Sequence, residues 1–481
     1  MVLSDANPFY LGTFLVYLLI VLAIGAWAYL RTETIDDFWV YGKELGPGLG
    51  TATYVAQFVS AVSVIGFIGA IYGDGYSVLT GIVFGLVLGT AALYFVVGRV
   101  RELDQITLPD IIADITGAEW SRPITATVLL GNAWAYLIMQ LVGASLLVTT
   151  ITGVPYRYMV WLIGGVFILY TVLGGLVSVA YTDLIQASIM VTTVAVVFAY
   201  FLVDLGGLGA INTQFAAVDS TNVAPLGDGT YTLFGLGASL IAFFGTTFTS
   251  QNQIILINAT RNVRTAKAML AASSFVLAIF YVLLVLVGAG TTVALVDAGL
   301  AVDNPDLAFP VLITEYLPTT IGTIIVLAVL SAILSTTDTY LHSTGVTTAR
   351  DIYDYFDPDA SDERLMRVSR LATIVFGITA TAIAVDPPGT LIAIYEFRAI
   401  LLTSAFLVPI YGALYLRGVP GTAVLAAMLV GTAIGVGWEA LGNPLGVPAT
   451  ILAVVTGAAL LGAGVAVRRR RPDVADRSGA P

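Results

Sequence analysis

Thirteen stretches of roughly 20 apolar residues divide almost the whole of this 481-residue chain between them. Each is long enough to cross a hydrocarbon core about 30 Å thick as a helix. Because 58% of the residues are hydrophobic and only 11% are charged, a soluble fold could not bury this much apolar surface. The sequence therefore predicts an all-α polytopic membrane protein. A soluble enzyme, a nucleic-acid-binding protein and, since the chain has no cysteine, a disulfide scaffold are excluded.

The thirteen predicted transmembrane helices define the domain organisation. They cover residues 8–30, 48–72, 78–98, 123–152, 157–175, 179–203, 231–257, 266–296, 318–348, 368–385, 389–416, 420–440 and 447–467. The first is too long for the apolar core of a signal peptide and runs into Arg31, so it is expected to remain as a helix. The expected units are a leading helix and inner loop (1–47), two five-helix units (48–205 and 206–417), two trailing helices (418–471) and a disordered cytoplasmic tail (472–481).

Basic residues predict the orientation. If the N-terminus lies outside and each span reverses direction, all of them lie inside except Arg157, which is outside, and Arg398, which is within a span. The two longest outer loops, near 204–230 and 297–317, contain acidic residues but no lysine or arginine. Because cytoplasmic loops carry the excess of lysine and arginine, the N-terminus is predicted outside and the C-terminus inside.

Two spans are expected to be broken. Residues 48–69 in the second span and 233–253 in the seventh place glycine, serine and threonine near the membrane midplane. Spans two to six and seven to eleven form two units of five, and an odd number of spans makes the two units face opposite ways. Paired broken helices in inverted repeats indicate the central site of a transporter, although ordinary small-residue packing is an alternative.

The ninth span carries an unusual density of hydroxyls, SAILSTTDTYL from Ser331 to Leu341. The spacing of Ala332, Ser335 and Thr336 puts one carbonyl and two hydroxyls on one helix face. Three neutral oxygens suit a small monovalent cation, and carbonyls freed by the break in the second span could complete the shell. Alternatively, both hydroxyls only bond back to carbonyls one turn earlier.

Ionisable residues within spans are functional hypotheses because they are costly in lipid. Asp183 either attracts a cation near the inner start of the sixth span or caps that helix. Asp338 and Glu396 are structural ion-pair candidates, and Arg398 either joins an ion pair or holds a substrate carboxylate. On the fourth span, polar side chains either line a solute pathway or bond between helices: Asn132, Trp134, Tyr136 and Gln140.

At three motifs the sequence resembles the solute:sodium symporter family. These are GGLVSVAYTDLIQ (174–186), SAILSTTDTYL followed by ARDIY (331–341 and 349–353), and TLPD (107–110). The resemblance implies the inverted-repeat fold of leucine-transporter-like symporters, with one leading and two trailing helices. It also implies that Asp183 lies on the sodium pathway, and that sodium is bound by the carbonyls of Ala56, Val59 and Ala332 and the hydroxyls of Ser335 and Thr336.

The sequence departs from the family at positions that contact substrate. Phe58 stands at the break where proline and sugar transporters place a polar or acidic side chain, and Val62 replaces the polar group that sugar transporters use. Aromatic residues alternating with small ones suggest a compact, partly apolar pocket for an amino acid or a monocarboxylate. The substrate-binding candidates are Phe58, Ser60, Ser63, Phe244, Thr246, Asn252 and Arg398.

The expected function is sodium-coupled symport of a small organic solute into the cell by alternating access. The protein is expected to be a multi-pass transporter of the cell membrane rather than an enzyme, with sodium as the co-transported ion, no organic cofactor and no obligate protein partner. A proton-coupled symporter, using Asp183, Asp338 or Glu396, and a membrane solute sensor are the alternatives.

Overall fold

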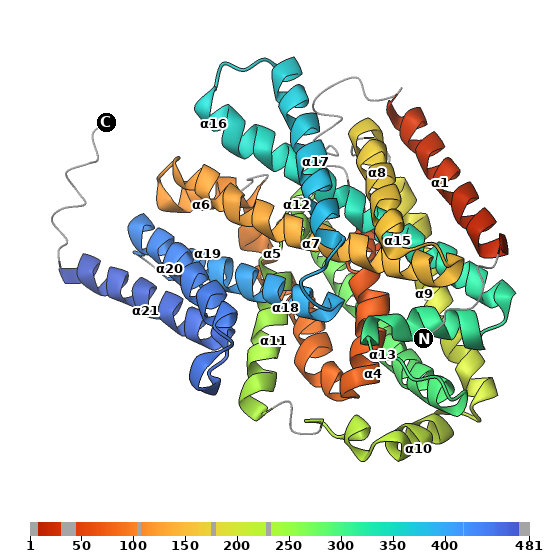
Figure 1. Cartoon of the computed structure of the whole chain (residues 1–481). Coiled ribbons are helices and arrows are strands. Elements are labelled where there is room, and N and C mark those ends of the chain that lie inside the picture. Colours follow the sequence, from red (N-terminus) through yellow and green to blue (C-terminus); the bar gives the residue numbers. More distant parts are fainter. Residues whose placement is uncertain are drawn as a thin grey trace.

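The computed structural model describes residues 8–29, 45–102, 107–174, 179–227, 232–416 and 418–470, and these form helices joined by short connections (Figure 1). The first half contains α1 (Pro8–Tyr29), α3 (Pro47–Ala56), η1 (Val62–Gly66), α4 (Phe67–Asp74), η2 (Leu79–Val83), α5 (Phe84–Glu102), α6 (Leu108–Thr116), α7 (Ser121–Thr152), α8 (Tyr156–Gly174), α9 (Val179–Asp204), α10 (Leu208–Val218) and η3 (Ser220–Val223). The second half contains α11 (Leu233–Phe248), α12 (Gln251–Ala259), α13 (Val263–Asp297), η4 (Pro305–Leu307), α14 (Ala308–Val311), η5 (Leu312–Tyr316), α15 (Thr319–Val346), η6 (Thr347–Tyr353), α16 (Asp354–Phe356), α17 (Asp362–Ala384), α18 (Leu391–Leu402), η7 (Thr403–Leu407), α19 (Val408–Tyr415), α20 (Gly421–Ala440), η8 (Pro444–Gly446) and α21 (Ala449–Arg470). Apart from helices, the only pairing within these ranges is one isolated bridge between Leu45 and Thr260.

Each predicted span falls on a helix or a pair of helices. Within the described ranges nine helices are long and apolar enough to cross a membrane, or ten if α9 and α10, bent by 83° at their junction, count as one span. The remaining predicted spans fall on α1, on α3 to α4 and on α8, which are shorter or interrupted apolar helices. The all-helical membrane architecture is therefore confirmed, while the number thirteen stays a prediction.

The second predicted span is broken at its centre. Helix α3 ends at Ala56, residues 57–60 leave the helix, and the chain resumes as η1 and α4. Ser63 holds the bend locally, because its N–H donates to the Ser60 hydroxyl at 3.4 Å and its own hydroxyl donates to the Phe58 carbonyl. Serine side chains that bond nearby backbone groups compete with the helix in this way, so the break follows from the composition that predicted it.

The seventh predicted span is interrupted by two non-helical residues between α11 and α12. The Thr249 hydroxyl donates to the Gly245 carbonyl at 2.8 Å, and Ser250 adopts the extended conformation (φ −66°, ψ 124°). Helix α11 lies against α5, where a Cβ built on Gly85 or Gly89 would meet an α11 carbonyl oxygen at 2.8 Å. The glycine-rich face of the third span therefore lets α11 approach closely, as small residues do at membrane helix interfaces.

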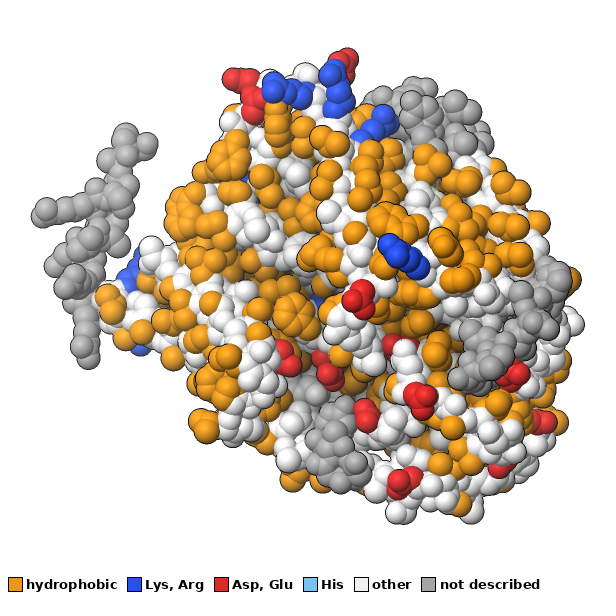
Figure 2. All heavy atoms as spheres, in the orientation of Figure 1, with side chains coloured by type: hydrophobic (Ala, Val, Ile, Leu, Met, Phe, Trp, Pro, Cys, Tyr) orange, Lys and Arg blue, Asp and Glu red, His pale blue; other side chains and the backbone are white. Residues whose placement is uncertain are grey.

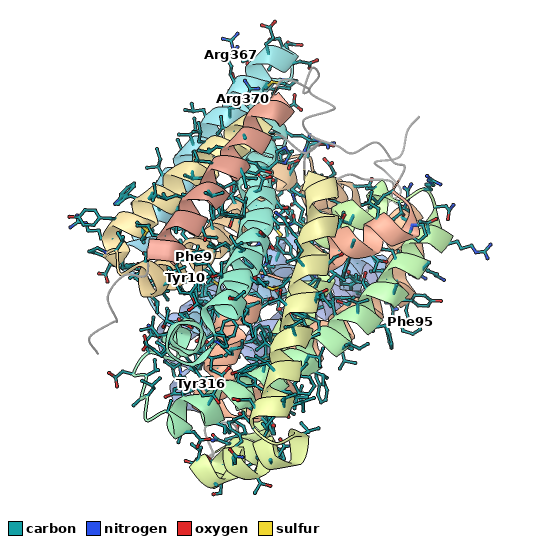
Figure 3. The ribbon with its side chains drawn as sticks, turned by 90° about the vertical axis from the view of Figure 1, so that its right-hand side faces the viewer. Phe9, Tyr10, Phe95, Tyr316, Arg367 and Arg370 are labelled. Atoms are coloured by element: carbon teal, nitrogen blue, oxygen red, sulfur yellow. The ribbon has the colours of Figure 1, made fainter. Side chains whose placement is uncertain are left out.

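On the face of the molecule shown in Figure 2, basic and acidic side chains are distributed unequally between the two ends. Lysine and arginine lie mainly at the end formed by α16 and α17, and most visible aspartate and glutamate lie towards the other end (Figure 2). Figure 3 shows Arg367 and Arg370 at the first end and Tyr316 near the second. This distribution is the one that the positive-inside rule predicts for an inner end at α16 and α17, so the orientation stays a prediction that the charges favour.

The central helices carry the predicted site, and peripheral helices surround them. Helices α7 and α15 pack against each other, while α1 and the α20–α21 pair lie at opposite edges of the view in Figure 1. In its most apolar stretch, helix α7 is 89% buried, whereas α21 is only 22% buried. The elements that contact the two breaks are therefore screened from the surroundings by the outer helices.

Candidate functional site

The hydroxyl cluster of the ninth span meets the break in the second span at Thr336. This residue on α15 is 1% exposed, and its hydroxyl shares its proton between the Ala332 carbonyl oxygen at 2.9 Å and the Val59 carbonyl oxygen at 3.1 Å. The bond to Ala332 is the local back-bond of helical threonines, and the bond to Val59 joins residues 277 positions apart. Thr336 therefore links the broken span to α15.

The other two predicted ligands lie next to this contact in the chain. Ala56 is the last residue of α3, and its carbonyl accepts from the Val59 N–H at 3.2 Å. Ser335 precedes Thr336 on α15 and is buried. All five ligand atoms would be neutral oxygens, the kind that unwound helices present to Na⁺ in transporters. The chemistry of this set therefore fits sodium.

A small cavity adjoins the break. Its volume is about 20 Å³, which is room for about one water-sized group. Residues from both broken spans and from α7, α15 and α18 line it: Gln57, Phe58, Ser60, Val62, Ser63, Tyr136, Thr246, Thr247, Ser250, Gln253, Tyr340, Tyr395 and Arg398. An organic solute can occupy this place only if the lining helices separate.

Arg398 provides the cavity with its positive charge. It is 4% exposed, and its Nη2 donates to the Tyr340 hydroxyl at 2.6 Å. The guanidinium lies 4.6 Å from the ring centre of Tyr136, 5.5 Å from that of Tyr340 and 5.4 Å from that of Tyr395. Its Nε has no hydrogen-bond partner, and no carboxylate in the described part of the chain lies within 4.0 Å of it. A buried cation whose described partners are only tyrosine hydroxyls and rings keeps further donors for an anion.

The structure brings five of the seven predicted substrate-binding residues to the cavity and leaves two away from it. Phe58, Ser60, Ser63, Thr246 and Arg398 line it. Phe244 lies outside the lining, with its ring tilted by 30° against that of Phe248 and the ring centres 5.0 Å apart. Asn252 is buried on α12 outside the lining, and its neighbour Gln253 takes that place.

Two tyrosines of the cavity were not among the predicted residues. Tyr340 lies one helical turn after Thr336, and Tyr395 lies one turn before Arg398. Positions three and four apart share a helix face, so the spacing alone could have identified both. Gln57 and Gln253 were missed too, since their position follows from how the two breaks pack.

The described part of the structure contains no ion pair of Asp338 or Glu396. Within the described residues neither carboxylate lies within 4.0 Å of a lysine or arginine. Asp338 is buried with a hydrogen bond to the hydroxyl of Thr171, and the charged groups that act on Glu396 are the carboxylates of Glu439 and Asp74. The reason is directional, because Arg398 is two positions from Glu396 and points to the tyrosines on another face of α18.

The polar candidates on α7 were expected either to line a solute pathway or to bond between helices, and both roles are found. On α7, Tyr136 lines the cavity, whereas Trp134 donates to the Thr379 hydroxyl at 3.1 Å and the Gln140 side-chain oxygen accepts from the Ala61 N–H at 3.0 Å. Solute lining and inter-helical bonding therefore both occur on this helix. The Asp183 side chain lies outside the described part of the structure.

Comparison with known proteins extends over nearly the whole chain. The High-affinity proline transporter PutP of Bacillus subtilis (strain 168) is 27% identical over 439 residues, which cover 88% of this chain and 90% of that protein. Sodium/proline symporter 2 of Staphylococcus saprophyticus is 27% identical over 449 residues, or 90% and 86% of the two chains.

The fold also matches a solved structure. The substrate-bound outward-open state of a Na⁺-coupled sialic acid symporter superposes with a TM-score of 0.76 at 18% identity, covering 95% of this chain and 96% of the other. Residues 38–431 match the sodium:solute symporter family. This range contains both broken spans, the hydroxyl cluster and the cavity. The chain is thus a multi-pass membrane protein that belongs to the sodium:solute symporter family.

Proposed function

We propose that this symporter carries a zwitterionic amino acid together with sodium, and that proline is the first solute to test. The main support for the proposal is the environment of Arg398. Its buried guanidinium lines the cavity and has no carboxylate partner among the described residues. A carboxylate can accept two parallel bonds from a guanidinium, which makes arginine the preferred partner for this group. The two relatives described above are named for proline transport, which agrees with a solute of this class.

Two glutamines of the cavity lining suit a positively charged nitrogen. The side-chain oxygens of Gln57 and Gln253 are buried, and neither has a donor in the described part of the protein. A buried acceptor without a donor is unfavourable unless a ligand supplies one. The ammonium or iminium group of an amino acid would supply it, whereas a simple monocarboxylate would not. We therefore favour an amino acid over a monocarboxylate.

We further propose that sodium binds among the oxygens of Ala56, Val59, Ala332, Ser335 and Thr336 and so joins the broken span to α15. The Thr336 hydroxyl already links these elements through Val59, so an ion at this point would strengthen an existing contact. Bound sodium would fix the break that also forms one wall of the solute cavity. Solute and ion would thereby stabilise the same arrangement, which is the basis of coupled binding.

One sodium ion is energetically sufficient for concentrative uptake. Entry of one positive charge at about 100 mV, inside negative, releases about 2.3 kcal/mol. A tenfold sodium gradient adds about 1.4 kcal/mol. Together these could sustain a solute gradient of several hundredfold.

Uptake into proteoliposomes tests the proposal. Radiolabelled proline, acetate, pantothenate and glucose would be offered with an inward sodium gradient or with a proton gradient alone. Proline uptake that requires sodium is expected. Proline uptake driven by protons alone would overturn sodium coupling, and sodium-driven uptake of acetate or glucose but not proline would overturn the solute class.

The sodium site has its own matched pair of variants. Ser335→Ala combined with Thr336→Ala should abolish sodium stimulation while the protein stays folded. Thr337→Ala is the control, because the Thr337 hydroxyl is equally buried but bonds only to the Ile333 carbonyl of its own helix, at 2.6 Å. Unchanged sodium dependence in the double variant would remove these residues from the site.

A further inference from the structure

The break in the second span depends on a side chain from another helix. Ala61 is the first helical residue after the break, and in a continuous helix its N–H would donate to the carbonyl of residue 57. Here it donates instead to the Gln140 side-chain oxygen on α7, at 3.0 Å. Both residues are fully buried, so water cannot replace this bond. Gln140 therefore satisfies the backbone donor that the break releases.

A close backbone approach fixes α7 at the same point. Gly143 lies three positions after Gln140, and so on the same helix face. A Cβ built on Gly143 would lie 2.5 Å from the Ala61 Cβ, nearer than real Cβ atoms approach. Gly131, on the same helix, has nothing within 4 Å of its built Cβ. The close fit is thus specific to the part of α7 that meets the break.

Gln140 binds the N–H of Ala61, which lies two residues after Val59, the residue whose carbonyl contacts α15. Val59 presents its carbonyl oxygen to the Thr336 hydroxyl at 3.1 Å, and the chain then passes through Ser60 to Ala61. Fixing the Ala61 N–H fixes one end of this short segment, while Thr336 holds the other end. The direction of the Val59 carbonyl is therefore set from two helices, α7 and α15.

From these contacts we infer that Gln140 is a positioning residue for sodium binding: it holds the Ala61 N–H and so keeps the Val59 carbonyl turned towards Thr336. The inference rests on the proposed sodium site. It predicts that Gln140 acts on sodium affinity rather than on the solute. Gly143 acts with it by allowing α7 to reach the break.

Two variants of Gln140 separate the hydrogen bond from the volume of the side chain. Gln140→Met keeps the length but removes the acceptor, and the half-saturating sodium concentration for uptake should rise about tenfold, as expected for the loss of one buried hydrogen bond. The solute KM at saturating sodium should change less than about threefold. Gln140→Glu keeps an acceptor and should stay within about threefold of the parent in half-saturating sodium.

Two glycine variants give an independent measurement. Gly143→Ala should raise the half-saturating sodium concentration because its Cβ would displace Ala61, and Gly131→Ala on the same helix should not. Monodisperse elution and a cooperative thermal transition would establish that each variant is folded. If Gln140→Met does not fold, the other three variants still test the inference. The half-saturating sodium concentration should rise in Gly143→Ala but not in Gly131→Ala or Gln140→Glu.

Thr336→Ala, measured beside these variants, distinguishes failure of the inference from failure of the sodium site. If Thr336→Ala raises half-saturating sodium but Gln140→Met and Gly143→Ala do not, the positioning role is overturned and the site stands. If the two α7 variants change the solute KM as much as the sodium dependence, the role is also overturned. If Thr336→Ala has no effect, the proposed sodium site fails and this inference with it.

Discussion

Arg122 and Arg350 lie against carboxylates at the α6–η6 end of the molecule, whereas Arg398 at its centre lies among tyrosine rings. Arg122 Nε is 3.2 Å from an oxygen of Asp110 and 3.2 Å from one of Asp351, and Arg350 Nη2 is 3.1 Å from Asp110. The two aspartates thus offset the charge of the two partly buried arginines. Arg398 has no such counter-ion among the described residues, and this contrast separates charges that hold the fold from a charge available to a solute.

Removing the carboxylate at the paired end should have the largest effect on stability. The Asp351 side chain is completely buried, so Asp351→Ala leaves Arg122 without one of its two partners. We expect a loss of about 1.5 to 3 kcal/mol in the free energy of unfolding, because Thr107 and Arg122 lose a buried charged acceptor while Arg122 keeps Asp110. Thermal denaturation of the purified protein measures it. Solute affinity of the remaining folded protein should be unchanged.

An exposed ion pair provides the control for this variant. Arg364 and Asp357 lie 3.2 Å apart with side chains 61% and 37% exposed. Asp357→Ala should cost less than about 1 kcal/mol, because exposed pairs contribute little. Equal effects of Asp351→Ala and Asp357→Ala would contradict a structural role for the paired end.

Arg398→Gln should show the reverse pattern. Loss of the guanidinium should lower solute affinity at least about a hundredfold, equivalent to about 3 kcal/mol, because a buried charged bond to the solute disappears. Stability should be kept, since no carboxylate in the described structure is left unpaired. Equilibrium binding of radiolabelled solute and thermal denaturation give the two values. A destabilised variant with normal solute affinity would show that Arg398 belongs with the structural arginines.

Local patterns in the sequence were sufficient to predict the helices but not to predict which groups pair with the charged residues. Apolar runs located the spans, and clusters of glycine, serine and threonine located both breaks, since each property depends on neighbouring residues. The Thr336–Ala332 bond follows from helical spacing, and so would the position of Tyr340. The proximity of Thr336 to Val59, by contrast, was implied only by the family resemblance, which placed both among the sodium ligands.

Contacts between distant residues explain what could not be predicted. Arg350 and Asp110 are 240 positions apart, and no local pattern joins them. The ion pairs expected for Asp338 and Glu396 are not found among the described residues, because a charged residue in a span indicates that a partner is needed but not which group provides it. The tyrosines around Arg398 come from three different helices, α7, α15 and α18, so only the packed structure brings them together.

Asp306 extends the comparison to an unpaired acid outside the spans. It lies in the loop before α14, is 3% exposed, and accepts a hydrogen bond from the Leu391 N–H at 2.9 Å. Burial raises its pKa to about 6, although this hydrogen bond opposes the shift. Because the pKa in the folded state lies above the usual value near 3.9, the folded state binds the proton more tightly. Stability should therefore rise as the pH falls from about 6 to about 4, and the contribution should be constant above that window.

Asp306→Asn tests this dependence. The amide oxygen can still accept from the Leu391 N–H, but the side chain no longer carries a charge. The pH slope between about 4 and 6 should decrease, and the variant should be about 2 kcal/mol more stable than the parent at pH 7.5. Thermal denaturation across this pH range measures both effects. An unaltered slope would mean that other groups produce it.

Tyr340→Phe should give the smallest effect, and it tests how Arg398 is held. The variant keeps the aromatic ring 5.5 Å from the guanidinium but removes the hydroxyl to which Nη2 donates at 2.6 Å. Loss of one orienting bond should weaken solute binding about fivefold, equivalent to about 1 kcal/mol, with little change in half-saturating sodium. Tyr411→Phe is the matched control, because the Tyr411 hydroxyl bonds to the Phe248 carbonyl and lies outside the cavity. Tighter solute binding by Tyr340→Phe would show instead that the hydroxyl competes with the solute carboxylate for Arg398, so the sign of the change distinguishes an orienting tyrosine from a competing one.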